Sequence, residues 1–571
     1  LSPDDALSRI LSGTGFSPYK PSAGEIGIIR RQSQREEMGS AVELAQANPR
    51  PQSVETVTVT SSKLGGADVQ SVPIAITAMS QEQLTATQTA GGPDLVKSVP
   101  NLTFSKTNFS GYNLQIRGIG TQAISVTTDP AVAVALNDIP FIRNHFFEQE
   151  FYDVGQVEVL RGPQGTLYGR NATAGVVNLA SAKPTDQWEA MGSVDVGNYN
   201  NRRLEGMLNI PIIGDKLDVR LAGEWTKRDG YTFDETTDKP VDGRDLWSGR
   251  VTVGLHPVEN LHADLVWEHF QESDDRLRSA KTLCKTDPGP SSIDGPAGPI
   301  TNIDISGRAY LSQGCLPGSL YDASAYQAPN ANAFPFVAAA EYVYNLIPQG
   351  FDPYGGVQLS RHLRVIGSAL EPGYRAHNDT VEFNANYDIT SALTLTSQTG
   401  YNKDSLYSTE DYNRFNTVSG AFVSNDGTPT SAVGNSPVGD DGIYCDPQLG
   451  CSDRLLGEDV SQEHAEQFSQ EVRLASNFDG PLNFSVGASY LHYQTIEDYF
   501  VFFNAITLIT EDQNAANGGL GADAMTGGAG HDTYYIDNVG DTVTEGSNAG
   551  IDLVQSTVSF TLSANVDNLF L

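Results

Sequence analysis

The chain has 571 residues, and its 70 acidic against 35 basic residues give a formal net charge of −35. This charge excludes recognition of a nucleic-acid backbone, which needs clustered Lys and Arg. The longest apolar run, residues 131–136, is far shorter than the ~20 residues of a membrane-spanning helix. Strands of a membrane β-barrel remain possible, because their alternating patterns keep the average hydropathy low.

Residues 1–31 are predicted to form one small folded piece, with a helix at its start and short strands at residues 16–19 and 26–30. This length is too short for an independent core, so we expect half of a domain. Residues 32–53, rich in Gln, Glu, Ala, Asn and Pro, are predicted to be a linker. Because Leu1 stands first and no signal peptide follows, we expect the sequence to begin inside a longer protein.

From about residue 188 apolar and polar side chains alternate, which predicts strands with one apolar face. Leu217, Val219 and Leu221 share one face of such a segment, and charged residues alternate with them. Nine segments show this pattern, at residues 188–198, 202–212, 216–228, 246–256, 261–273, 377–389, 392–407, 464–477 and 482–500.

Many of these segments exceed ten residues and are longer than the usual strands of soluble proteins. Long connections, near residues 274–376 and 408–463, alternate with short turns. Tall strands with short turns at one rim and long loops at the other are typical of an outer-membrane β-barrel. A large soluble β-sandwich is the alternative.

The chain has four cysteines, Cys284, Cys315, Cys445 and Cys451. They form no CxxC pair and have no histidine at zinc spacing, so we expect no zinc site. All four lie in loop-like sequence, where an even number favours disulfides and an oxidising compartment. Three pairings are possible. The two local ones, Cys284 with Cys315 and Cys445 with Cys451, would each close one loop; four unrelated buried thiols are the alternative.

Residues 54–185 hold the most informative sequence. Four elements follow one another there: residues 113–120 (NLQIRGIG), 132–137 (VAVALN), 157–169 (VEVLRGPQGTLYG) and 174–178 (AGVVN). In this order they resemble the plug domain of TonB-dependent outer-membrane receptors, and the resemblance extends over the alternating strands to about residue 503. An unrelated glycine-rich α/β domain is the alternative. Residues 1–31 also resemble the C-terminal half of the short periplasmic domain shared by secretins and some of these receptors.

The resemblance implies a mainly β chain, with an α/β plug domain and a partial antiparallel outer-membrane β-barrel of about nine strands in membrane lipid. Glycines permit tight turns and close backbone approach where a plug must fit inside a barrel wall. The glycines expected in these turns are Gly118, Gly162, Gly165 and Gly169.

The resemblance also implies a lock between plug and barrel. Arg117 and Arg161 would project from the plug into the polar lumen, where an arginine needs a carboxylate to offset the loss of water. Glu471, on the polar face of a predicted strand, resembles the partner that the family's barrel supplies. Solvated turn arginines are the alternative.

Residues 55–60 (ETVTVT) resemble the TonB box, the segment by which such receptors engage the energy-coupling protein TonB. The β-branched alternation suits addition to an exposed sheet edge of that partner. The implied function is capture of a scarce small nutrient, possibly an iron–siderophore, followed by transport when TonB pulls the plug. The box residues are Glu55, Thr56, Val57, Thr58 and Val59.

The last part of the chain differs from the rest: residues 504–571 contain nine acidic residues and no Lys or Arg. Residues 518–526 (GGLGADAMT) and 527–535 (GGAGHDTYY) match the nonapeptide of the calcium-binding RTX β-roll. We expect their strands to stack on each other and to bury Met525 and Tyr534. A disordered acidic linker is the alternative. The predicted Ca²⁺ ligands are Gly519, Gly521, Asp523, Gly528, Gly530 and Asp532.

The leading hypothesis is a TonB-dependent receptor of the bacterial outer membrane that takes up a siderophore, a vitamin or a similar nutrient. We expect it to be truncated or fused, because about nine strands cannot close the family's barrel. The alternative is a calcium-binding secreted or surface protein of the RTX type. The sequence shows no catalytic constellation, so we expect neither an enzyme nor an organic cofactor. The predicted domains are a half-domain (1–31), a linker (32–53), box and plug (54–185), partial barrel (186–510) and RTX-like repeats (511–571).

Overall fold

The chain divides into two compact units, residues 1–56 and 57–571. In the first unit, strands β1 (Phe16–Tyr19) and β2 (Gly27–Arg30) pair antiparallel, where two short strands were expected. The predicted helix at the start and the linker lie outside the described residues. The computed structural model describes residues 16–19, 27–30, 58–59, 67–68, 72–106, 112–121, 128–143, 145–214, 216–344, 346–348, 351–412, 417–423, 437–516, 524–526, 531–547 and 551–570.

Residues 72–181 form an α/β domain around a five-stranded sheet with the order β10-β9-β12-β11-β5. Strand β9 runs parallel to β12, and the other neighbours are antiparallel. All five residues of β9 are buried, which explains why this strand has an uninterrupted apolar sequence. The strands are β5 (Ala75–Ser80), β9 (Val132–Leu136), β10 (Ile139–Phe141), β11 (Val154–Arg161) and β12 (Gly175–Ser181).

Short helices and a second sheet complete this domain. Helix α2 (Gln81–Ala86) begins with a capping box, in which the Ser80 hydroxyl and the Gln83 side chain satisfy each other's backbone N–H groups. The main apolar core of the domain includes Leu84, Leu114 and Phe147. The remaining elements are η1 (Gly92–Lys97), η2 (His145–Glu148), α3 (Gly165–Tyr168), β6 (Leu102–Lys106), β7 (Tyr112–Ile116) and β8 (Ile119–Gly120).

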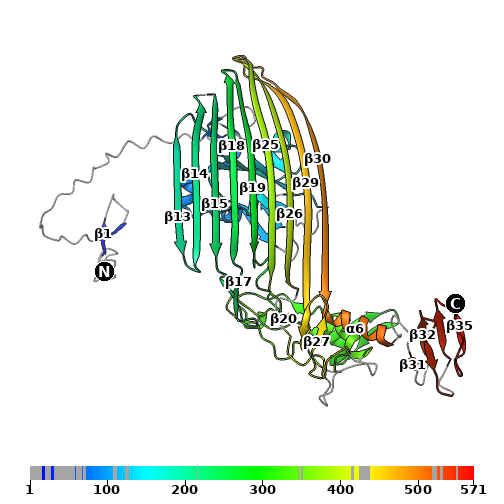
Figure 1. Cartoon of the computed structure of the whole chain (residues 1–571). Helices are drawn as coiled ribbons and strands as arrows, with labels where there is room; N and C mark the ends of the chain where they lie inside the picture. Colours follow the sequence, from blue (N-terminus) through cyan, green and yellow to red (C-terminus); the bar gives the residue numbers. More distant parts are fainter. Residues whose placement is uncertain are drawn as a thin grey trace. The chain divides into compact units, whose positions relative to one another are not determined.

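The largest element is a nine-stranded antiparallel sheet in which each strand pairs with its neighbour in the order β13-β14-β15-β18-β19-β25-β26-β29-β30 (Figure 1). Each of the nine alternating segments of the sequence lies in one of these strands. The strands are β13 (Glu189–Gly197), β14 (Asn201–Ile213), β15 (Leu217–Arg228), β18 (Arg244–Val258), β19 (Leu261–Asp274), β25 (Gly373–Thr390), β26 (Leu393–Asp411), β29 (Gly457–Ser476) and β30 (Ser485–Phe503).

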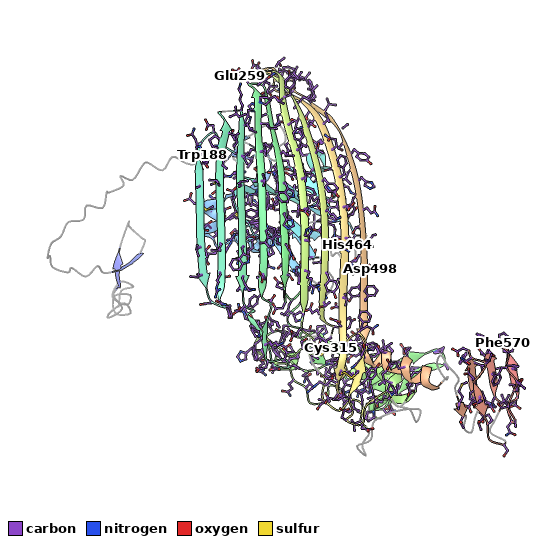
Figure 2. The ribbon with its side chains drawn as sticks, viewed as in Figure 1. Trp188, Glu259, Cys315, His464, Asp498 and Phe570 are labelled. Atoms are coloured by element: carbon purple, nitrogen blue, oxygen red, sulfur yellow. A yellow bond between two sulfur atoms is a disulfide. The ribbon has the colours of Figure 1, made fainter. Side chains whose placement is uncertain are left out.

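The two ends of this sheet differ in the length of their connections. Residues 259–260 and 391–392 make tight turns at one end, whereas residues 275–372 and 412–456 make long loops at the other. Glu259 lies in a tight turn, and Cys315 lies among the long loops at the opposite end (Figure 2). In the described part of the chain, no helix is long and apolar enough to cross a membrane.

The polar face of the sheet is buried and much of its apolar face is exposed. In β19, Glu268 and Glu272 are buried, whereas Leu265 and Trp267 are 41% and 47% exposed. A soluble β-sandwich buries the apolar faces of its sheets. The observed burial is the reverse, and it agrees with the outward apolar band of a membrane sheet.

The long loops form a compact region with its own apolar core, which includes Leu346, Phe422 and Tyr444. Helix α6 (Asn504–Ala516) follows β30 and adds Leu508 to this core. The predicted domain boundary at residue 510 therefore falls inside one helix. The smaller elements here are β16 (Thr232–Asp234), β17 (Lys239–Val241), β20 (Lys285–Thr286), β21 (Ser292–Gly295), β22 (Gly298–Thr301), α4 (Ile305–Tyr310), β23 (Cys315–Leu316), η3 (Ala323–Ala325), η4 (Ala331–Ala333), α5 (Pro335–Tyr342), β24 (Val365–Ile366), β27 (Tyr444–Asp446) and β28 (Gly450–Ser452).

Two small parallel sheets, β31-β33 and β32-β34-β35, form the C-terminal segment. Met525 and Tyr534 are buried in their shared core, as expected. Strands β31 and β32 lie in different sheets that share this core, because each pairs with a strand that follows the nonapeptides. The strands are β31 (Ala524–Thr526), β32 (Thr533–Ile536), β33 (Thr542–Thr544), β34 (Leu553–Ser556) and β35 (Asn568–Phe570).

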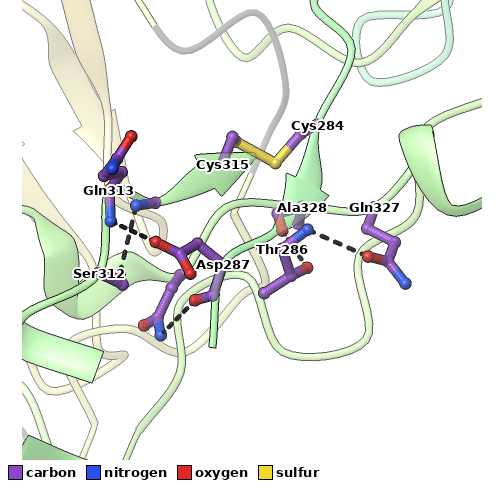
Figure 3. The surroundings of a disulfide bond; sticks show 10 residues. Cys284, Thr286, Asp287, Ser312, Gln313, Cys315, Gln327 and Ala328 are labelled. Carbon is purple, nitrogen blue, oxygen red and sulfur yellow. Dashed lines mark hydrogen bonds between the residues drawn. A yellow bond between two sulfur atoms is a disulfide. The ribbon is translucent and has the colours of Figure 1, made fainter. Parts of the chain in front are cut away.

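The structure contains the two local disulfides, Cys284–Cys315 and Cys445–Cys451. Around the first, Thr286 and Asp287 hydrogen-bond to loop segments distant in sequence (Figure 3): the Thr286 hydroxyl donates to the Ala328 carbonyl over 2.6 Å, and the Gln313 N–H donates to the Asp287 carboxylate over 2.8 Å. The backbone N–H groups of Gln313 and Gly289 donate hydrogen bonds to the Asp287 carboxylate and thereby lower the pKa of this carboxyl group.

We expect Cys284→Ser with Cys315→Ser to destabilise the loop region by roughly 3–4 kcal/mol, since this bond closes a loop with a sequence separation of 31. The pair Cys445→Ser with Cys451→Ser, with a separation of 6, is the matched control and should cost less. Free-thiol labelling of the unreduced chain checks the premise; labelling of all four cysteines would refute it.

Candidate functional site

The α/β domain docks on the polar face of the nine-stranded sheet through residues 148–153. Asp153 accepts two hydrogen bonds from the Arg220 guanidinium, 2.8 Å from Nε to Oδ2 and 2.6 Å from Nη2 to Oδ1. Both side chains are buried, and the paired geometry is the strong fork that arginine makes with carboxylates. Asp153 has a φ of 45°, in the left-handed region that Asp tolerates better than most residues.

A second buried arginine binds the backbone of the same segment. Arg250 of β18 donates to the carbonyl oxygens of Tyr152 and Asp153 over 3.0 and 2.7 Å. Its guanidinium lies 4.7 Å from the centre of the Tyr152 ring and pairs with Glu268 over 3.3 Å. Arg250 therefore connects the Glu268 carboxylate of the sheet to residues 152–153 of the α/β domain.

Glu148 and Glu150 extend this contact along the sheet. Glu148 accepts from Arg276 over 2.6 Å and pairs with Lys106 over 3.0 Å. Arg203 of β14 lies 3.3 Å from Glu150 and donates to the Phe151 carbonyl over 2.8 Å. In this cluster strand β14 and the loop after β19 supply the arginines, and the α/β domain supplies the carboxylates together with Lys106.

The sequence predicted ion pairs with the arginine on the α/β domain and the glutamate on the sheet. Arg143 and Glu463 of β29 form a pair of this kind. Beside it, Gln467 accepts from the Ile142 N–H over 2.9 Å and donates to the Pro140 carbonyl over 2.8 Å. This second contact region fixes the β10 end of the domain against β29.

The predicted lock residues lie on both sides of the interface. Arg117 occupies a turn with a φ of 56°, and its Nη1 would lie 3.6 Å from a Cβ added at Gly162. Glu471 of β29 forms an ion pair with Arg473 of the same strand. Joint binding of Arg117 and Arg161 to Glu471 stays a prediction.

Three of the four predicted turn glycines have positive φ angles: 76° at Gly118, 120° at Gly162 and 75° at Gly169. These conformations favour glycine. Gly165 differs, because it begins helix α3 and a Cβ there would meet no atom within 4 Å. The structure therefore gives no steric reason for glycine at this position.

A cavity of about 540 Å³ lies between the α/β domain and strands β26, β29 and β30. Its walls include Tyr168 and Arg170 from the glycine-rich element, and Glu471 and Arg473 from the sheet. The 165–169 element and Glu471, both singled out in the sequence, line this cavity. Sequence reasoning missed Asp153, although Arg220 is one of the charged residues that alternate with Leu217, Val219 and Leu221.

The residues predicted to contact TonB precede this domain. Thr58 and Val59 form strand β3 (Thr58–Val59), which pairs antiparallel with β4 (Ala67–Asp68), and Val59 is fully buried. Glu55, Thr56 and Val57 lie outside the described residues. In the described part of the chain β3 and β4 form a two-stranded sheet, so β3 keeps one edge to which a further strand could add.

Two groups of side chains in the described ranges could hold a metal ion. One is His269, His377 and Asp379, on strands β19 and β25. The other is Asp532, Glu545 and Asp552 in the C-terminal segment. Asp532 was a predicted Ca²⁺ ligand, whereas Glu545 and Asp552 were not. The other predicted ligands, Gly519, Gly521, Asp523, Gly528 and Gly530, lie outside the described residues.

We expect Asp153→Ala to lower the free energy of unfolding by about 3–5 kcal/mol, because it removes the carboxylate that the buried Arg220 binds through two hydrogen bonds. Asp129→Ala is the matched control: Asp129 pairs with Arg170 over 2.5 Å with both side chains more than half exposed, so its loss should cost at most about 1 kcal/mol. Urea titration of the chain in detergent micelles measures both. Equal losses of stability in the two variants would contradict the role of Asp153 as a buried contact between the α/β domain and the sheet.

Burial, reinforced by the Arg276 charge, lowers the pKa of Lys106 to about 8. Between pH 8 and the ordinary value of 10.5 the unfolded chain binds a proton that the folded chain has released, so stability should rise with pH across this window. Lys106→Met should remove that rise, whereas Lys97→Met, at an exposed lysine, should keep it. Urea midpoints measured across this pH range provide the check, and parallel pH profiles for the Lys106 variant and the unmodified chain would contradict the prediction.

Comparison with known proteins agrees with this architecture. Residues 68–176 match the family model of the TonB-dependent Receptor Plug Domain. The Pesticin receptor of Yersinia pestis is 28% identical over 228 residues, which cover 39% of this chain and 32% of the relative. The catecholate siderophore receptor Fiu of Escherichia coli is 33% identical over 115 residues, covering 20% and 14%. The chain thus aligns with a third or less of these relatives' lengths.

Among solved structures, the ferripyoverdine receptor of the outer membrane of Pseudomonas aeruginosa aligns with a TM-score of 0.48 and 12% identity, over 87% of this chain and 51% of that chain. The family match covers the α/β domain whose docking is described above. Residues 68–176 therefore match the plug domain found in TonB-dependent receptors, siderophore receptors are among the relatives of the chain, and the chain is located in the outer membrane.

Proposed function

We propose that this chain serves in the TonB-coupled uptake of a siderophore, a vitamin or a similar small nutrient across the outer membrane, and that its nine-stranded sheet is part of a receptor barrel. The observation that carries the proposal is the plug itself, a domain with its own apolar core that Asp153, Glu148 and Arg143 hold on the polar face of the sheet. An interface made of ion pairs suits a plug that must move during transport.

The chemistry of the interface supports release under force. Separation of two apolar surfaces exposes both to water at a cost proportional to the area. Separated carboxylates and guanidinium groups are instead solvated by water as they part, which offsets much of the lost attraction. The pairs fix the resting position of the plug through their geometry and still permit water to replace them during transport.

The TonB box supplies the mechanical connection in this proposal. Among the described residues, strand β3 pairs with the two residues of β4 alone, so a strand of TonB could add to its other edge or displace β4 at the cost of few hydrogen bonds. Pulling on residues 55–59 would then reach the plug through the residues that follow β4. The nutrient would bind at the long-loop end of the sheet and pass along the side of the displaced plug, where the 540 Å³ cavity already separates plug and strands.

A second candidate function, a calcium-binding secreted or surface protein of the RTX type, is favoured by the carboxylate group of the C-terminal segment. The two functions differ in what they require. Uptake requires the plug and TonB, whereas the calcium-binding function requires only residues 511–571. We favour uptake, because the plug family match and the buried plug interface both concern transport rather than calcium.

We expect Val57→Pro to abolish binding of the purified periplasmic fragment of TonB to the full chain in detergent, because proline removes a backbone donor and resists strand pairing. Ser53→Pro, in the predicted linker, is the matched control and should leave binding unchanged. Calorimetric titration measures both. If the Val57 variant binds as tightly as the control, the proposed coupling is wrong.

A further inference from the structure

Two histidines and one aspartate meet on the exposed face of the nine-stranded sheet. His269 of β19 lies directly opposite Asp379 of β25, and its Nδ1 lies 2.9 Å from Oδ1 of that carboxylate. His377, two residues before Asp379 on the same strand, places its Nε2 3.4 Å from Oδ2. The Asp379 carboxylate thus has an imidazole nitrogen beside each of its two oxygens.

The cluster lies where this face of the sheet changes from apolar to polar. One row of apolar side chains, 38–47% exposed, crosses four neighbouring strands and consists of Trp267, Val381, Tyr401 and Phe468. The next row toward the long loops is polar and consists of His269, Asp379, Lys403 and Glu466. Aromatic side chains border the apolar band of a membrane sheet on the side of the water. The cluster therefore lies just beyond that border, where ions from the surrounding solution can reach it.

The three side chains have the ligand types and the spacing of a zinc site. One ligand atom from each lies within 4.8 Å of the others. Zinc binds His nitrogen and Asp oxygen at about 2.0–2.2 Å, so the ligands of one tetrahedral ion lie about 3.3–3.6 Å apart. An ion would replace the hydrogen between Nδ1 of His269 and Oδ1 of Asp379, widen that contact and release the proton to solvent.

The surroundings hold the ligand rings in position. The His269 ring lies 4.6 Å from the Trp247 ring of the neighbouring strand β18, and it meets the His377 ring edge-on at 4.9 Å and 77°. Its side chain is 15% exposed, whereas those of Asp379 and His377 are 34% and 41% exposed. An ion can therefore enter over the two more exposed ligands without any opening of the core. Ligands that are already ordered also reduce the entropy cost of binding.

We propose that His269, His377 and Asp379 form a site for Zn²⁺ or a similar divalent transition metal. Two imidazoles favour such metals, whereas Ca²⁺ and Mg²⁺ prefer oxygen ligands throughout. Three protein ligands leave the fourth tetrahedral position to water. The site lies on the face of the sheet opposite to the plug, so it is separate from the nutrient path proposed above.

The site has a structural consequence. His269 and Asp379 are 110 residues apart in sequence, and their strands enclose the loop of residues 275–372. The ion would connect the two strands at the base of this loop. Because it would bind the folded chain alone, zinc should stabilise the fold by mass action and raise the urea concentration at the unfolding midpoint.

Quenching of tryptophan fluorescence by Cu²⁺ tests the site in the full chain in detergent. Cu²⁺ binds nitrogen and oxygen sites more tightly than Zn²⁺ does. Trp247 and Trp267 lie beside His269, with ring separations of 4.6 and 6.3 Å, and are two of the four tryptophans of the chain. Copper at the site should therefore quench their emission, and added Zn²⁺ should restore it.

Variants of the ligands test the assignment. His377→Gln and Asp379→Asn should each weaken copper affinity at least about tenfold, the size seen when metal-site groups are changed. His464→Gln is the matched control, because His464 is exposed on β29 in the same register row as His377, and it should leave the affinity unchanged (Figure 2). His256→Gln is included in every chain, since Nδ1 of His256 lies 2.8 Å from Nδ1 of His262 and this pair offers copper a second site.

A further variant locates the ion. Trp188 precedes the edge strand β13, away from the proposed site (Figure 2). Trp188→Phe removes emission that copper at His269 does not reach, so the quenched fraction of the remaining emission should rise. A fall in that fraction would place the copper elsewhere and overturn the proposal.

Urea midpoints measured in zinc and in chelator separate loss of the ion from loss of the fold. Zinc should raise the midpoint of the unmodified chain and of the His464 variant, and it should leave the midpoints of the His377 and Asp379 variants unchanged. The difference within each chain does not depend on its stability without metal. Equal midpoints of the unmodified chain in zinc and chelator, or unchanged copper affinity in both ligand variants, would refute the site. None of these measurements involves TonB, so the uptake proposal is tested separately.

Discussion

A single constraint organises the structure: the nine-stranded sheet directs charged side chains inward, and each buried charge needs a partner. Arg220 and Arg250 cannot reach bulk water, because the plug covers them. Their partners are the Asp153 carboxylate and the carbonyl oxygens of Tyr152 and Asp153. The outward apolar face and the inward ionic face are thus two consequences of one strand pattern.

This constraint also determines how the plug is held. Contacts that consist of oriented ion pairs select one position and one orientation, because a guanidinium fork fits a carboxylate in few geometries. The plug core, by contrast, is one cluster of buried apolar side chains that includes Leu84 and Phe147. The plug therefore has an apolar interior and a polar boundary with the sheet.

The C-terminal segment meets the same electrostatic problem with a different composition. The plug and sheet contain both signs of charge, so their buried groups pair within the protein. The C-terminal segment has acidic residues but no Lys or Arg, and two of its carboxylates, Glu545 and Asp552, are nevertheless buried. The plug interface is thus neutralised by arginine, whereas the C-terminal segment contains no arginine or lysine that could do the same.

The sequence by itself determined the secondary structure of the sheet and the identity of the plug. Strict alternation is a local property, so all nine strands could be found, and the RGPQGTLYG element lies at the interface with the sheet as expected. Pairing across the chain could not be found in this way. Asp153 and Arg220 are 67 residues apart, and Asp532 meets Asp552 only because β32 pairs with β34 rather than β31. Which charges meet depends on strand order and register, and these are set by the packing of the whole chain rather than by any local pattern.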